Sequence, residues 1–124
     1  MAVGRLHHVI VDCADPLLEA TFWSQVLGRP ITHRDDDFAV VAESDRASGL
    51  AFQRAPGHAA PHWPSDDGDQ QLHLDGMVDD LAAAAEAVVA LGARPLGGSG
   101  SVFADPAGHP FCLIPRPSWA PPVG

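Results

Sequence analysis

An internal repeat constrains the fold of this chain more than any other feature of its sequence. The first copy places His8 in a short apolar strand pattern and an acidic residue, Asp15, seven positions later. The second copy has His73 and Asp80 at the same spacing, and after each acidic residue a helical pattern runs to a Leu-Gly pair. Two stretches that share this order of features predict a duplicated structural unit.

The first copy predicts a βαβββ unit. The segment 5–14 is short and rich in β-branched side chains, which is typical of a strand. Asp15 and Pro16 predict an N-cap followed by a proline at the first helical position, and Gly28 ends a helix over 17–27. Turn-rich stretches then separate three short predicted strands, at Ile31–Arg34, Phe38–Ala42 and Leu50–Arg54.

The second copy repeats this order. A strand at Leu72–Val78 leads to a helix that is capped by Asp79 or Asp80, runs to Leu91 and is closed by Gly92. Further short strands are predicted near Arg94–Leu96, Ser101–Ala104 and Phe111–Ile114, with turns at 97–100 and 105–108 between them.

These patterns predict a single α+β domain built from two tandem modules. The linker between them is rich in Pro and Gly, and we interpret it as ordered, with Trp63 pinning it, rather than as a lid over a pocket. The proline-rich tail is expected to be a surface strap or to fray, because prolines cannot continue a sheet. The predicted segments of residues 1–124 are module one at about 5–55, the linker at about 56–70, module two at about 71–115 and the tail at 115–124.

Composition excludes several kinds of partner. The chain has 16 acidic and 7 basic residues and a formal charge of −9, whereas nucleic acid or an anionic membrane would favour a basic face. No apolar run approaches the roughly 18 residues that a membrane span needs, and the first residues lack the apolar core of a signal peptide. We therefore expect a cytoplasmic protein, in which Cys13 and Cys112 are free thiols.

Strand alternation predicts which side chains share a face. The apolar sets, such as Val9 with Val11 and Leu72 with Leu74, are expected to pack under the helices. The opposite face then carries one potential metal ligand per strand, namely His8, Gln53, His73 and Cys112. The sequence has no short-range metal motif, so pocket or core histidines remain an alternative to ligands.

Three more residues are candidates for the same face or its rim. Asp12 and Asp75 alternate with the apolar sets, and they are interpreted as an acid/base pair, as partners that orient the histidines, or as solvated carboxylates at strand ends. Trp63 is the aromatic candidate for closing over a ligand.

The ordered set of motifs resembles the vicinal oxygen chelate superfamily, which includes glyoxalase I, bleomycin-resistance proteins, fosfomycin-resistance enzymes and extradiol dioxygenases. A small glyoxalase-like branch common in actinobacteria is the most similar. The resemblance implies two βαβββ modules that form a curved mixed sheet with helices outside and a concave cavity, often in a homodimer. Its carriers are His8, Asp15-Pro16, Phe22-Trp23, Leu27-Gly28, His73 and the run from Asp105 to Leu113.

The resemblance also implies where a metal would bind. Metal-dependent members take four ligands from the first and last strands of each module, and the matching positions are His8, Gln53, His73 and Cys112. Cys112 stands where glutamate is usual, so this set lacks a carboxylate. Zinc, iron, nickel or no metal then fits better than magnesium or manganese, and glyoxalase I activity is not expected.

Two functions follow as expectations. The first is a metal-free protein that binds or sequesters a small organic molecule in the cavity, using His8, Asp12, Gln53, Trp63, His73, Asp75 and Cys112. The alternative is a metal-dependent lyase, isomerase or dioxygenase with His8 and His73 as ligands.

Overall fold

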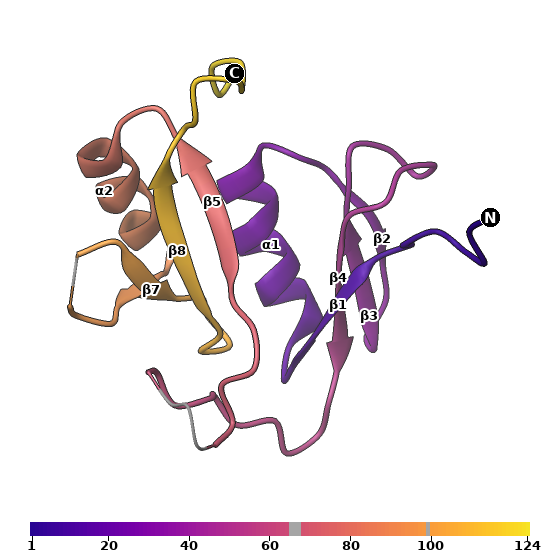
Figure 1. The fold of residues 1–124 in the computed structure, drawn as a ribbon. Coiled ribbons are helices and arrows are strands. Elements are labelled where there is room, and N and C mark those ends of the chain that lie inside the picture. Colours follow the sequence, from indigo (N-terminus) through magenta and orange to yellow (C-terminus); the bar gives the residue numbers. More distant parts are fainter. Residues whose placement is uncertain (65–67, 99) are drawn as a thin grey trace. The chain divides into compact units, whose positions relative to one another are not determined.

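The chain forms two compact units in the computed structural model, Met1–Ala59 and Ala60–Gly124 (Figure 1). The structure describes residues 1–64, 68–98 and 100–124. Part of the predicted linker, 65–67, and Ser99 of the predicted glycine-rich turn lie outside the described residues.

The first unit is the predicted βαβββ module. Its sheet has the order β1-β4-β3-β2, with β1 and β4 parallel and the other neighbours antiparallel. The polypeptide can place β4 parallel to β1 because α1 and the β2–β3 hairpin return the chain to the same end of the sheet. The elements are β1 Val9–Cys13, α1 Pro16–Leu27, β2 Ile31–Arg34, β3 Phe38–Val41 and β4 Leu50–Arg54.

The second unit has the same topology. Its sheet has the order β5-β8-β7-β6, and β5 and β8 run side by side in the same direction (Figure 1). Two mixed four-stranded sheets with two helices confirm the predicted α+β fold of tandem βαβββ modules. The elements are β5 Leu74–Val78, α2 Leu81–Leu91, β6 Arg94–Pro95, β7 Val102–Ala104 and β8 Pro110–Pro115.

The ends of both helices follow from the repeat. The Asp15 side chain accepts a hydrogen bond from the Leu18 backbone N–H at 3.2 Å, and Asp80 accepts one from Ala83 at 3.0 Å. These are N-caps, which satisfy backbone donors that have no partner within the helix. Gly28 ends α1 with φ of 62°, a left-handed conformation that favours glycine. The acidic residue that follows each histidine in the repeat is therefore a helix cap.

One face of each sheet packs under a helix. In the first unit Val11, Phe52 and Ala39 lie in register across β1, β4 and β3 and are buried, and α1 contacts β3 and β4. Phe22 and Trp23 of α1 are buried as well. In the second unit α2 packs against β8, along one face of the sheet (Figure 1). The opposite face of each sheet is the one that the alternation assigns to the polar candidates.

Several predicted strands end or begin one residue away from their observed bounds, and two further differences from the prediction have a clear physical reason. Leu72 was expected to pack under a helix but is 65% exposed, because β5 begins only at Leu74 and the residues before it are not held by the sheet. Pro115 was expected to start the tail, yet it is the last residue of β8. The pairing of β8 with β5 continues to Pro115 although proline has no N–H, because the next residue, Arg116, donates its N–H to Val78 O at 2.8 Å.

The tail is a strap rather than a frayed end. The Asp79 carboxylate accepts hydrogen bonds from the Arg116 side chain and from the Val123 backbone N–H. Arg116 also donates to Ala120 O, and Ala120 is buried.

In the described part of the chain, no helix has the length and apolar character that crossing a membrane requires.

Candidate functional site

In the first unit the candidate residues lie on, or just before, the neighbouring strands β1 and β4. Asp12 of β1 and Gln53 of β4 are directly opposite each other in the parallel pairing, so both point to the face away from α1. His8 immediately precedes β1, and its Nδ1 accepts a hydrogen bond from the Gly49 N–H at 3.0 Å. A neutral imidazole that accepts at Nδ1 carries its proton on Nε2. His8 in this arrangement has no lone pair to offer a metal.

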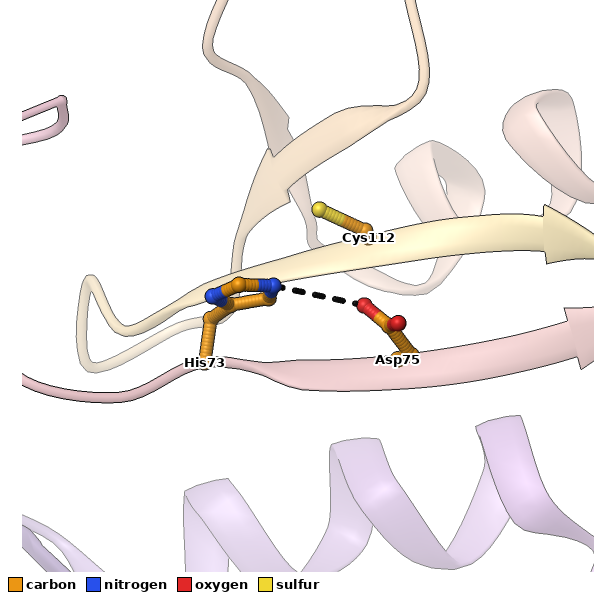
Figure 2. Close-up of side chains that lie close together, drawn as sticks. All are labelled: His73, Asp75 and Cys112. Carbon is orange, nitrogen blue, oxygen red and sulfur yellow. Dashed lines mark ion pairs between the residues drawn. The ribbon is translucent and has the colours of Figure 1, made fainter.

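In the second unit three candidate side chains form a cluster. His73, just before β5, and Asp75 of β5 make an ion pair with 3.4 Å between Nε2 and Oδ1 (Figure 2). Cys112 of β8 is directly opposite Asp75 in the parallel pairing. One ligand atom from each of the three lies within 4.8 Å of the others. The sheet places them together because residues two apart on a strand share a face, as do residues paired across strands.

Trp63 extends this cluster. Its ring meets the His73 ring in a T-shaped contact with 5.4 Å between centroids, an arrangement that aromatic rings favour. Trp63 is partly buried, in contrast to its exposed neighbour His62. The His62 ring and its backbone N–H both bond to the Asp69 carboxylate, at 2.8 and 3.0 Å. The segment that carries Trp63 is thus tied to a residue on the other side of 65–67.

The electrostatics of the cluster disfavour a thiolate. Burial raises the pKa of the Cys112 thiol, and the negative charge of Asp75 raises it further. A nucleophilic cysteine needs the opposite environment, with a lowered pKa beside a cation. The residue types alone would suggest a cysteine nucleophile, Cys112, beside a histidine base, His73, and an acidic residue, Asp75. The raised pKa of the Cys112 thiol does not favour nucleophilic catalysis in this environment.

The two units differ in how far apart their candidates lie. In the second unit Asp75 and its partner Cys112 lie two residues further along the strands than His73, a distance of roughly 7 Å. In the first unit Asp12 and Gln53 are two pleats from His8, roughly 13 Å along the strand. The two histidines therefore hold equivalent positions in the repeat, but the polar pairs Asp12–Gln53 and Asp75–Cys112 do not. The second unit has a compact cluster because its polar pair lies nearer to the histidine.

The structure thus divides the predicted site residues. Trp63, His73, Asp75 and Cys112 gather in the second unit. In the first unit Asp12 and Gln53 share a face, and His8 bonds to the Gly49 backbone just before β4. The sequence did not give Asp75 as a metal ligand, although its spacing of two from His73 placed both on one face. A cavity formed jointly by the modules, and the ligand set His8, Gln53, His73 and Cys112, stay predictions.

The comparisons with known proteins agree with this architecture. A family model described as a glyoxalase-like domain matches residues 8–114. The chain belongs to this glyoxalase-like family, and with it to the vicinal oxygen chelate superfamily that the sequence motifs predicted. No curated protein matches the sequence significantly.

Solved structures share the fold at low sequence identity. A glyoxalase/bleomycin resistance protein/dioxygenase family enzyme from Burkholderia phytofirmans is similar with a TM-score of 0.65 and 18% identity, over 89% of this chain and 97% of that one. The oxidase ChaP-H2 is similar with a TM-score of 0.61 and 21% identity, over 99% and 100%. The bleomycin-binding protein of Streptomyces verticillus, complexed with copper(II)-bleomycin, is similar with a TM-score of 0.55 and 18% identity, over 94% and 100%.

A divalent metal is often used in this superfamily, so the fit of the donors matters. Imidazole and thiolate suit a soft or borderline ion such as zinc, whereas magnesium takes oxygen ligands almost alone. His73, Asp75 and Cys112 are the side chains that would hold such an ion, which would polarise an oxygen of the substrate. The donor set fits zinc, on condition that the Cys112 proton is released on binding.

Proposed function

We propose that this chain binds a small organic molecule without a resident metal, and that it sequesters this molecule rather than transforming it. The observation that carries the metal-free part is the hydrogen bond from Gly49 to His8 Nδ1. It leaves the first predicted ligand of the superfamily pattern without a donor lone pair. Gln53, two pleats further along, contributes only a neutral amide.

The binding part is supported by the composition of the cluster in the second unit. Small-molecule sites combine apolar and aromatic walls with a few polar groups that fix orientation. Trp63 supplies the aromatic wall and lies against His73, whose other neighbours are Asp75 and Cys112. The similar protein from Streptomyces verticillus is a bleomycin-binding protein, so this fold supports binding of a small molecule elsewhere.

A second candidate function keeps a metal. One ligand atom from each of His73, Asp75 and Cys112 lies within 4.8 Å of the others, which is the observation that favours it. In this alternative the chain is a metal-dependent lyase, isomerase or dioxygenase, with His73 as a ligand and with His8 as a further one that gives up its hydrogen bond from the Gly49 N–H.

Metal content separates the two functions. We expect protein purified without chelator to contain far less than one equivalent of zinc, iron, nickel or copper by mass spectrometric elemental analysis. His73→Ala should have the same low content, and His33→Ala is a matched control because His33 is an exposed histidine of β2 that is not among the candidate site residues. One equivalent of metal in the wild type and in His33→Ala, lost in His73→Ala, would establish the metal-dependent candidate instead.

A further inference from the structure

The charge of the binding face in the second unit indicates what kind of ligand it takes. Asp75 lies between His73 and Met77 on this face of β5, and its side chain is 50% exposed. A carboxylate can accept about four hydrogen bonds, and the ion pair with His73 engages one of its two oxygens. Asp75 therefore keeps acceptor capacity that is accessible to a bound molecule.

Apolar surface continues from Asp75 along the same face. Met77 and Ile114 are paired across β5 and β8, one pleat beyond Asp75 and Cys112, and they are 40% and 36% exposed. On the other side, Trp63 contacts His73. The carboxylate is thus flanked by two aliphatic side chains in one direction and by an aromatic ring in the other.

No arginine of the described second unit neighbours this carboxylate. Arg116 is occupied by Asp79 and by Ala120 O. Arg94 is in β6, which is separated from β5 by β7 and β8. An anionic ligand would find no arginine of the described second unit beside Asp75 and would meet a chain of net charge −9, whereas a cation would be attracted both by Asp75 and by the net charge.

We infer that the ligand of this face is an organic cation with a planar apolar body, an inference that rests on the proposed binding function. Its ammonium or similar group pairs with Asp75, and its planar body extends past His73 to Trp63, while Met77 and Ile114 flank the charged group on the other side. A tryptophan ring adds a cation–π attraction when the charge lies close to it. The aliphatic flanks distinguish this ligand from a bare metal ion, which would gain nothing from them.

Three probes of matched shape test this inference in the full chain. They are 2-naphthylmethylammonium, 2-naphthylmethanol and 2-naphthoate, each titrated with chelator present while the indole N–H signals of the tryptophans are followed by NMR. Trp63→Phe identifies the Trp63 signal. We expect the ammonium probe to bind about fivefold or more tightly than the other two, because only it carries a positive charge that can pair with the Asp75 carboxylate.

Variants locate the charge that causes the preference. In Asp75→Asn the advantage of the ammonium probe should fall to about twofold or less, since the amide keeps the shape but not the charge. Asp36→Asn is the matched control, because it removes the same charge from an exposed position of the first unit and should keep the preference. Equal or stronger binding of the naphthoate or the alcohol at Trp63 would overturn the cation inference while leaving the binding function intact. If none of the three probes perturbs Trp63, both proposals fail.

Discussion

At the scale of single residues, position on the strand decides what each candidate side chain does. His8 and His73 open equivalent strands, yet His8 accepts from the Gly49 N–H while His73 pairs with Asp75 and Trp63. The sequence could predict that both histidines share faces with carboxylates, because alternation is a backbone property. It could not predict their partners, because these depend on side-chain rotamers and on the turn that carries Gly49.

The backbone at Gly49 lies very close to the end of β3. A methyl group here would overlap Val41 O and would lie 2.9 Å from the Ala42 side chain. We expect Gly49→Ala to lower the free energy of unfolding by about 1–3 kcal/mol, the usual cost of overpacking. It should also displace the N–H that bonds to His8. Urea unfolding followed by circular dichroism measures the loss of stability.

Gly4→Ala is the matched control, because a Cβ at Gly4 meets no atom within 4 Å. Equal stability of the Gly49→Ala and Gly4→Ala variants would contradict the close contact between Gly49 and residues Val41 and Ala42.

At the scale of elements, the repeat predicted most of the secondary structure. Ile31–Arg34 and Leu50–Arg54 are strands with the predicted bounds, and α2 ends at Leu91 as predicted. These segments combine clear turn residues with short apolar runs. The start of β5 was less predictable, because Leu72 continues the apolar alternation but has no neighbouring strand to pair with.

The caps of the two helices can be tested as a pair. Asp15→Ala and Asp80→Ala should each lower stability by about 1 kcal/mol, because each leaves a backbone N–H of the first helical turn without its acceptor. Asp15→Asn and Asp80→Asn should retain most of the stability, since asparagine also caps. Urea titration of all four variants measures this. A loss of the same size in the asparagine variants would assign the effect to charge rather than to capping.

At the scale of the whole molecule, the strongly acidic composition includes carboxylates with specific partners in both units. Asp35 in the β2–β3 turn accepts from the Asp37 and Phe38 N–H groups and contacts His33, and these bonds hold its carboxyl pKa below the ordinary value of 3.8. The His62 backbone and ring lower the pKa of Asp69 in the same way. The homodimer implied by the superfamily stays a prediction at this scale.

These two shifts predict how stability depends on pH. A carboxyl whose pKa is lower in the folded than in the unfolded state stabilises the fold above the unfolded value, and the contribution is lost as the pH falls through the folded value. We therefore expect stability to decrease below about pH 4, and the decrease to be smaller in Asp35→Asn and in Asp69→Asn. Urea midpoints measured from neutral to acidic pH test this. Asp36→Asn is the control from the same turn, and a pH profile as flat as that of Asp35→Asn would contradict the role of the Asp35 hydrogen bonds.

The strap formed by the residues after β8 has a practical consequence for handling the protein. Asp79, which receives Arg116 and the Val123 N–H, directly precedes the residue that caps α2. A truncation after Arg116 would remove the Val123 N–H from the Asp79 carboxylate and the Ala120 carbonyl from Arg116, next to the first turn of α2, and a purification tag fused tightly to this end would disturb the same contacts. A flexible spacer, or a tag at the exposed residues before β1, preserves these contacts during purification and labelling.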